Sequence, residues 1–153
     1  MADTRLYCTL YLESYYFGVE VSQVQEVLRY LEMTRIPLAH SVVRGLINLR
    51  GQLVTAIDLR RRLELPPREE NANPMNVIVR TEDGPVSLLV DRIGDVVEVQ
   101  EADFERPPET LRGAARSLVL GVYKLAGKLL LILDLDRAVQ LPGEREELAL
   151  ASA

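Results

Sequence analysis

Few side chains in this chain have the type and spacing that catalysis or metal binding requires. The 153 residues contain one histidine, His40, and one cysteine, Cys8. One residue of each type makes a zinc site only if carboxylates supply the remaining ligands. His40 stands beside Ser41 in a polar loop, where a histidine is usually solvated, and Cys8 stands in an alternating segment, where a cysteine is usually a small buried residue. We therefore expect no metal, no cofactor and no catalytic residue.

The common motifs for phosphate binding and nucleophilic catalysis are absent from the sequence. It contains no Walker A loop, no GxGxxG and no GxSxG. Asp58 and Asp134 are candidates for a catalytic carboxylate pair, but they occupy equivalent places in an internal repeat, which favours two helix N-caps. The sequence thus predicts a protein that is not an enzyme, with a small enzyme or ligand-binding barrel as the alternative.

The arginines offer a better candidate for function. Arg60, Arg61 and Arg62 form the one dense basic cluster; Arg61 and Arg62 fit a solvated helix face, while Arg60 has no basic counterpart in the repeat. Arg50 precedes a glycine at a strand end, where packing can hold its guanidinium as a fixed fork of donors. Protein interfaces favour arginine at their hot spots. The alternative for Arg50 is an intramolecular ion pair with Glu26, and the two interpretations are compatible.

Charge and composition restrict the class of protein. The net charge is −5, the pI is about 5.0 and 48% of the residues are hydrophobic. An acidic chain lacks the basic footprint of a nucleic-acid-binding protein, and this hydrophobic content argues against disorder. No apolar run approaches the ~20 residues of a membrane span, and the N-terminus does not read as a signal peptide. The lone cysteine fits a reducing cytosol, so we expect a cytoplasmic protein without nucleic acid or membrane insertion.

One block of the sequence occurs twice. With no gap, 9 of the 24 residue pairs between residues 42–65 and 118–141 are identical. The identical pairs include Gly45/Gly121, Leu49/Leu125, Gly51/Gly127, Asp58/Asp134 and Leu59/Leu135. A repeat over this distance indicates two copies of one supersecondary unit. The shared residues are therefore candidates for fold, whereas Asn48 and Arg50, which face Lys124 and Ala126, are candidates for function.

The segment before the first block reads as a hairpin followed by a turn. Alternating residues at 5–12 and 15–21 predict two strands, and residues 27–30 return to strand character. Ser22 followed by Gln25 predicts a capping box at a short helical turn. A weak second repeat relates this region to residues 88–96, so each half offers a hairpin, a strand and a glycine-turn hairpin.

Turn residues divide the rest of the chain into short strands. Gly51-Gln52 and Gly127-Lys128 predict type II′ hairpin turns, and Asp83-Gly84 predicts a type I′ turn. The remaining segments are a linker at 65–74, strands at 75–80, 86–90 and 96–99, and a polar loop at 101–116. Many short strands with close turns, present in two copies, predict two small β-barrels packed together.

At these blocks the sequence resembles the CheW family of chemotaxis adaptor proteins. The segments that carry the resemblance are VQEV at 24–27, GLINLRG at 45–51, IDLR at 57–60, LLVD at 88–91 and ILDL at 132–135. The resemblance implies an all-β fold of two five-stranded SH3-like barrels, with short helices, around a shared apolar core. It runs from about residue 5 to residue 141, which implies one domain over 1–141 with lobes near 13–74 and 75–141, a shared N-terminal strand, and a flexible tail at 142–153.

The resemblance also implies a function and partners. CheW-family proteins are non-catalytic scaffolds that link the cytoplasmic tips of methyl-accepting chemoreceptors to the regulatory domain of the histidine kinase CheA, on the inner face of the membrane. The family's receptor groove lies between the barrels, and exposed barrel ends contact the kinase and build rings with further CheW copies. The same fold serving a pathway that controls pili or development is the alternative.

The partner-binding residues follow by position in the matched motifs. Gln25, Glu26 and Val27 belong near the receptor surface, and Arg50 matches the arginine associated with coupling receptor state to kinase activity. The candidates that complete the set are Asn48, Gly51 and Asp58, as supports of the hairpin, and Arg60. One departure is Thr55, which stands where the family usually has a proline and retains an N–H that a proline would lack.

Overall fold

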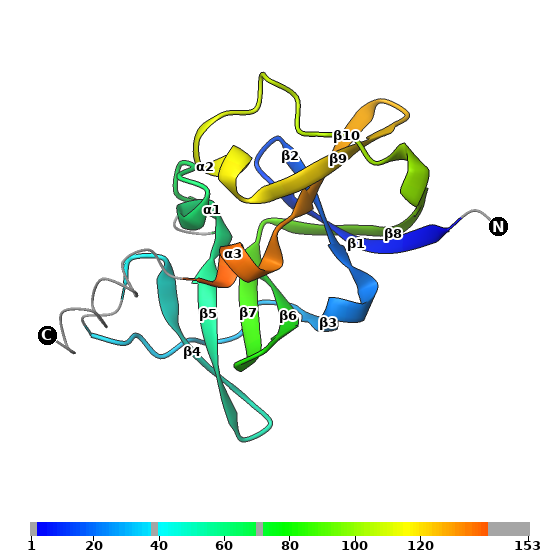
Figure 1. Cartoon of the computed structure of the whole chain (residues 1–153). Helices are drawn as coiled ribbons and strands as arrows, with labels where there is room; N and C mark the ends of the chain where they lie inside the picture. Colours follow the sequence, from blue (N-terminus) through cyan, green and yellow to red (C-terminus); the bar gives the residue numbers. More distant parts are fainter. Residues whose placement is uncertain (1–2, 38–39, 70–71, 141–153) are drawn as a thin grey trace, which may run out of the picture.

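The computed structural model describes residues 3–37, 40–69 and 72–140 and places its strands in two five-stranded sheets (Figure 1). Sheet A has the order β8-β1-β2-β10-β9, and sheet B has the order β3-β6-β7-β5-β4. Sheet A comprises β1 (Thr4–Leu12), β2 (Tyr15–Glu20), β8 (Arg92–Gln100), β9 (Val119–Leu125) and β10 (Lys128–Leu133). Sheet B comprises β3 (Val24–Leu28), β4 (Val43–Leu49), β5 (Gln52–Asp58), β6 (Met75–Thr81) and β7 (Gly84–Val90). The predicted all-β fold of two five-stranded units is confirmed.

In the described residues, five short helical segments accompany the strands. They are the 3-10 turns η1 (Val21–Gln23) and η2 (Glu101–Asp103) and the helices α1 (Leu59–Arg62), α2 (Gly113–Ser117) and α3 (Leu135–Val139). Figure 1 shows the three α-helices gathered where the two sheets meet. In the described part of the chain, no helix is long and apolar enough to cross a membrane. The tail expected at 142–153 lies outside the described residues.

The two sheets do not follow the predicted lobe boundaries at 13–74 and 75–141. Sheet A takes β1 and β2 from the first half and β8, β9 and β10 from the second, whereas sheet B takes β6 and β7 from the second half. A parallel ladder makes each exchange: β10 pairs with β2 at Leu131↔Phe17, and β5 pairs with β7 at Thr55↔Val86. The sequence repeat identifies two copies of a unit, but it does not determine whether the first hairpin of a copy pairs with strands of the same copy or of the other. The halves have exchanged their first hairpins.

One apolar core joins both sheets. Among its fully buried members are Leu10, Leu12 and Phe17 from sheet A and Ile57 and Leu88 from sheet B. The three α-helices contribute Leu59, Ala115 and Leu135 to the same cluster. Burial of side chains this large stabilises by about 1.5–3 kcal/mol each, so the lobes are held together chiefly by hydrophobic packing.

The hairpin turns differ from the predicted types. In the β4–β5 turn, Arg50 (φ 50°) and Gly51 (φ 87°) both have positive φ, which is the type I′ pattern. In the β9–β10 turn only Gly127 (φ 73°) does, as in type II. Both type II′ predictions are wrong because the strands resume at Gln52 and Lys128, which leaves each glycine as the second central residue.

Two other local predictions are also wrong. The β6–β7 turn consists of Glu82 and Asp83, and Gly84 already pairs with Thr81, so Asp83-Gly84 is not a type I′ turn. The capping box at Ser22 is absent, because η1 begins one residue earlier and has no side-chain cap. The two aspartate caps are confirmed: the Asp58 carboxylate accepts from the Arg60 N–H and the Asp134 carboxylate from the Arg137 N–H.

The repeated glycines have a shared structural role. A Cβ on Gly45 would lie 2.5 Å from the carbonyl oxygen of Thr34, and a Cβ on Gly121 would lie 2.6 Å from that of Glu105. These carbonyls belong to isolated antiparallel bridges, Thr34↔Leu46 and Glu105↔Val122. The glycine at this position of each repeat copy therefore leaves room for a connecting segment to pair with the edge strand, which is β4 in one copy and β9 in the other.

Candidate functional site

An ion pair between two separate elements forms the centre of the predicted site. The Arg50 guanidinium in the β4–β5 turn donates to the Glu26 carboxylate on β3. This hydrogen bond raises the pKa of Arg50, and the Arg50 side chain remains 67% exposed. The expected ion pair is therefore present, and it fixes the guanidinium while leaving it accessible.

The edge strand β3 presents the other predicted receptor residues. β3 forms one edge of sheet B, and its pairing with β6 shifts between Val24 and Glu26, which leaves a bulge at Gln25. Bulges redirect side chains at sheet edges. Gln25 is exposed, and Val27 is 38% exposed despite its apolar side chain. Gln25, Val27 and the ion pair thus share one end of sheet B.

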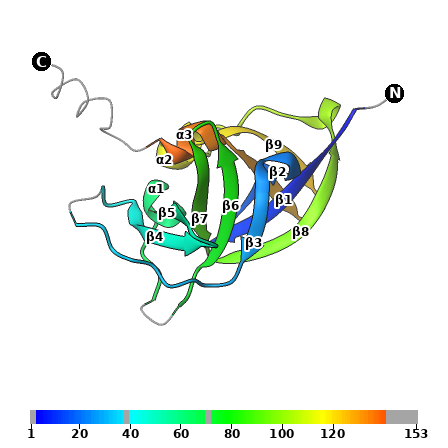
Figure 2. The ribbon, with the colours of Figure 1, turned by 90° about the horizontal axis from the view of Figure 1, so that it is seen from below.

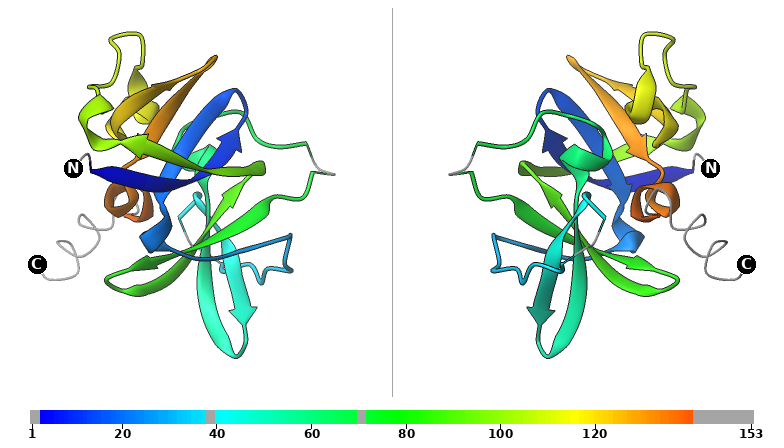
Figure 3. Two further views of the ribbon diagram at one scale, coloured as in Figure 1. Left: turned by 90° about the vertical axis from the view of Figure 1, so that its right-hand side faces the viewer. Right: turned by 90° about the vertical axis from the view of Figure 1, so that its left-hand side faces the viewer.

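The β4–β5 turn is stabilised locally by Asn48, whose Oδ1 accepts from the Gly51 N–H at 2.9 Å. Asn48 pairs across the hairpin with Leu53, which is 66% exposed. The hairpin extends beyond the rest of sheet B (Figure 3). Thr55, in the middle of β5, pairs with β4 on one side and begins the parallel ladder with β7 on the other.

Asp58 and Arg60 lie at the opposite end of the hairpin from this turn. The seven residues of β5 separate Gly51 from α1 by about 20 Å, at ~3.3 Å per residue. The Arg60 side chain donates to the Asp91 carboxylate through Nε at 2.9 Å and Nη2 at 2.6 Å. Neither Asp58 nor Arg60 can therefore support the turn at Arg50.

Arg68 completes a cluster of partly buried charges at that end. Its Nη1 donates to Asp58 Oδ1 at 2.9 Å and its Nε to Asp91 Oδ1 at 2.9 Å. Asp91 also accepts from the backbone N–H of Glu13 at 2.7 Å. Burial alone would raise the pKa of Asp91, but these hydrogen bonds, first that of Arg60, outweigh it and lower the pKa. Through Asp58 at the end of β5 and through Asp91, which also binds the β1–β2 turn, the cluster joins Arg68 to both sheets, which favours a structural role.

The eight predicted residues thus separate into two groups. Gln25, Glu26, Val27, Asn48, Arg50 and Gly51 share one end of sheet B, while Asp58 and Arg60 belong to the charge cluster at the other end. Sequence reasoning missed Leu53, because it is shared with Leu129 and the shared residues were assigned to fold. The outward position of Leu53 follows from strand alternation, since its neighbour Val54 is buried.

A second exposed apolar surface lies near β3. Val21 on η1, Leu6 on β1 and Val96 on β8 are 36%, 50% and 56% exposed. Cys8 pairs with Val96 across β1 and β8, which places Leu6 and Val96 on the same side of the sheet. Figures 1 and 2 both show η1 and β3 next to β1 and β8. The exposed apolar side chains of these neighbouring elements, Leu6, Val21, Val27 and Val96, are together called the β1–β3–β8 surface.

Residues 7–142 match the family model described as the CheW-like domain. The chain belongs to the CheW-like domain family. Its relatives include the chemotaxis protein CheW of Bacillus subtilis (strain 168), 32% identical over 118 residues that cover 77% of this chain and 76% of that protein. The chemotaxis protein CheW of Rhizobium meliloti (strain 1021) is 29% identical over 133 residues, which cover 87% of this chain and 84% of that protein.

A solved structure of the family shares the fold. The scaffolding protein TtCheW from Thermoanaerobacter tengcongensis superposes with a TM-score of 0.82 over 94% of this chain and 97% of that one, at 26% identity. The exchanged hairpins described above are thus part of a CheW-like architecture. Within the described residues, no group of three or more His, Cys, Asp or Glu side chains is arranged to hold a metal ion.

Proposed function

We propose that this protein is a non-catalytic coupling scaffold of a chemotaxis system. It links the cytoplasmic tips of chemoreceptors to the regulatory domain of the histidine kinase CheA and is recruited by the receptors to the inner face of the membrane. The observation that carries the proposal is the pairing of Glu26 with an accessible Arg50 beside exposed apolar side chains, in a chain of the CheW-like family.

The receptor tip is assigned to the β1–β3–β8 surface. An amphipathic helix binds by laying its apolar face on an apolar groove or surface, and Val27, Val21 and Val96 supply such a face. Glu26 is the middle residue of β3 and directly precedes Val27, so a helix bound along β3 lies next to a charged pair held in one position. This arrangement favours a partner with apolar residues at helical spacing and an acidic residue nearby.

The kinase is assigned to the end of the β4–β5 hairpin. Leu53 is an exposed apolar side chain at a rigid turn, opposite Asn48, and buried interfaces are built around such anchors. The equivalent turn of sheet A carries Leu129, 36% exposed, and offers a second barrel end for contacts with further copies in an array. Separate surfaces for receptor and kinase allow both partners to bind at once.

Binding measurements with two variants test this assignment. Val27→Asp is expected to weaken binding of a receptor-tip fragment at least tenfold, because it places a charge in the apolar contact, and to leave kinase-domain binding unchanged. Leu53→Ser is expected to do the reverse. The control is Leu120→Ser, which alters another exposed leucine, on β9 and outside both surfaces. If wild type binds neither fragment at tens of micromolar, the proposed function is wrong.

A further inference from the structure

A polar pocket lies between the lobes, and the proposed coupling function does not use it. The pocket has a volume of about 460 Å³. It is bounded by the segment that leads into β4, by α1 and the residues after it, and by α2. The lining residues that matter here are His40, Ser41, Arg61, Arg62, Glu64 and Ser117, and we call this the junction pocket. Because α1 follows sheet B and α2 precedes β9 of sheet A, the pocket has a wall from each lobe.

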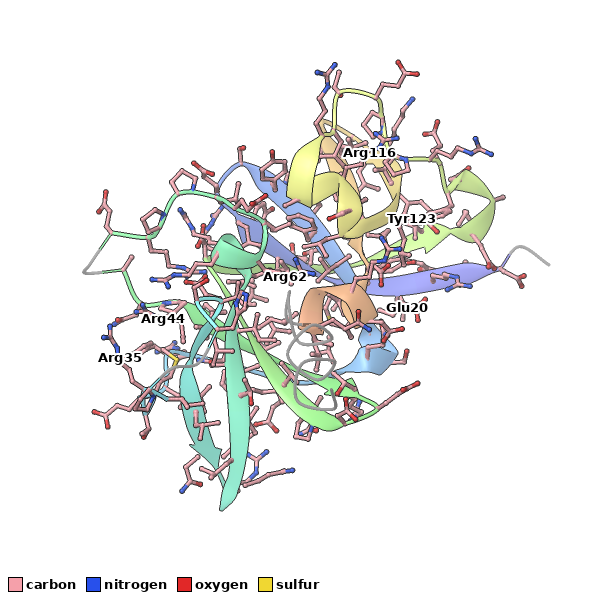
Figure 4. The ribbon with its side chains drawn as sticks, turned by 60° about the vertical axis from the view of Figure 1, so that its left-hand side comes forward. Glu20, Arg35, Arg44, Arg62, Arg116 and Tyr123 are labelled. Atoms are coloured by element: carbon pink, nitrogen blue, oxygen red, sulfur yellow. The ribbon has the colours of Figure 1, made fainter. Side chains whose placement is uncertain are left out.

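Arg62, one of these lining residues, has a buried donor without an acceptor among the described residues. Its Nη2 donates to the Arg137 carbonyl oxygen at 2.8 Å. Its Nε is buried, and no atom of the described residues accepts from it. Figure 4 shows Arg62 in the space between α1 and α3, whereas Arg35 and Arg44 lie on the outer side of sheet B. The expectation of a solvated helix face is therefore wrong for Arg62.

A buried guanidinium N–H without an acceptor costs free energy, so such a group calls for an anion or a water molecule. A comparison of the pKa shifts of Arg62, Arg50 and Arg60 favours an anion over a water molecule. A carboxylate raises the pKa of Arg50 and of Arg60, but burial lowers the pKa of Arg62, and the attraction of Glu64, which raises it, does not compensate. An anion bound next to Arg62 would supply the missing counter-charge.

Neighbouring groups add donors around the same space. Arg61 donates through Nη1 to the Ser41 carbonyl oxygen at 2.9 Å, and its Nε lies 3.9 Å from Asp58 Oδ2 in an ion pair. Neither contact uses its Nη2. His40 Nδ1 accepts from the Val42 N–H at 3.2 Å, so in the neutral ring the other nitrogen, Nε2, carries the proton and can donate. Among these lining residues, two arginines stand against one carboxylate, that of Glu64.

We propose that the junction pocket binds a phosphate-type oxyanion, with Arg62 and Arg61 as its principal donors. Arginine forks match the geometry of phosphate oxygens, and bonds to a charged acceptor are about twice as strong as neutral ones. The volume is many times the ~30 Å³ of one water molecule, so there is room for inorganic phosphate or for a small phosphate ester. A bound oxyanion contacts both walls and stabilises the arrangement of the lobes.

Nuclear magnetic resonance titration of the intact wild-type chain tests the site. The probes are sodium phosphate and O-phosphoserine, each compared with sodium chloride at equal ionic strength. Saturable shifts confined to the amides of residues 40–42, 61–64 and 113–117 are expected. Saturation by phosphate identifies a free anion as ligand, and saturation by phosphoserine alone identifies an ester. Shifts spread over the exposed arginines, or the same shifts with chloride, would overturn the proposal.

Two variants give opposite expectations. Arg62→Met is expected to weaken phosphate binding at least tenfold, while Arg44→Met, which changes an exposed arginine outside the pocket, is expected to leave it unchanged. Glu64→Gln removes the opposing carboxylate and is expected to tighten binding several-fold, and this test does not depend on whether Arg62→Met folds. If Glu64→Gln and wild type show the same absence of saturable binding, the Nε of Arg62 is satisfied by water alone.

Discussion

Arg50 is the residue whose structural contacts bear most directly on the proposed function. It is held by Glu26 from another strand, yet most of its side chain faces solvent. Exposed ion pairs contribute little to stability, whereas an arginine already fixed in position loses little entropy when it binds a partner. The Arg50–Glu26 pair is therefore better explained as preparation for binding than as stabilisation of the fold.

Arg50→Ala is expected to leave the thermal unfolding midpoint close to that of wild type. In the reconstituted complex with receptor and kinase, it is expected to lower the kinase activity about tenfold. Thermal unfolding followed by circular dichroism measures the first quantity, and kinase activity in the reconstituted complex measures the second. Glu26→Gln keeps the arginine but removes its partner charge, and it should produce a smaller loss of coupling. A large fall in the unfolding midpoint of Arg50→Ala would show that the ion pair is structural.

The two equivalent aspartates should differ in their contribution to stability. Asp134 caps α3 and is partly exposed, so Asp134→Ala is expected to cost about 1 kcal/mol. Asp58 caps α1 but is also buried beside Arg68, so Asp58→Ala is expected to cost about 3 kcal/mol. Urea denaturation of both variants measures the difference. Equal costs would mean that Asp58 acts as a cap and that the Arg68 pair contributes nothing.

The charge cluster also predicts a dependence of stability on pH. The pKa of Asp91 is lowered in the folded state, so its ionised form stabilises the fold above the unfolded-state value of about 3.9. That contribution disappears as the pH falls through the lower folded-state pKa. Asp91→Asn is therefore expected to cost about 2–3 kcal/mol at pH 7 and progressively less below pH ~4, by urea denaturation at each pH. Asp95→Asn, an exposed substitution on β8, is the control and should show no such trend.

At the scale of elements, the sequence predicted which segments are strands better than it predicted their turns. Alternation and the repeat located both glycine-turn hairpins and both aspartate caps. The type I′ turn at Arg50 was not predictable, because it places an arginine at positive φ, and Glu26 and Asn48, which bind this turn, come from β3 and β4. The contact between Arg68 and Asp91 was not predictable for a similar reason, since the composition of a polar linker does not indicate which distant residue it contacts.

The repeated glycines make a prediction for the connecting segments. A Cβ on Gly121 would overlap the Phe104 ring, at 2.1 Å from Cζ, as well as the bridging carbonyl oxygen of Glu105. Gly121→Ala is therefore expected to destabilise by about 2–3 kcal/mol and to increase hydrogen exchange at Val122. Gly127→Ala is the control: its Cβ meets no atom within 4 Å, so only the positive φ opposes it, at about 1 kcal/mol. A neutral Gly121→Ala would show that the 104–106 segment is not packed on β9.

At the scale of the whole molecule, the exchange of hairpins is the feature that sequence reasoning did not foresee. Each sheet contains strands from both halves of the chain, so neither half contains a complete sheet. The repeat was visible in the residues, but pairing partners are set by the parallel ladders between β2 and β10 and between β5 and β7. Through this exchange, β3 of one sheet comes to lie beside β1 and β8 of the other and forms the surface assigned to the receptor.

If the proposed function is right, the receptor surface and the kinase surface are occupied at the same time. Sedimentation velocity of a mixture of this protein, a receptor-tip fragment and the CheA regulatory domain tests it most directly. We expect a complex that contains all three components, whereas the receptor fragment and the kinase domain mixed without this protein are not expected to sediment together. A mixture in which the receptor fragment and the kinase domain displace each other from this protein would contradict it.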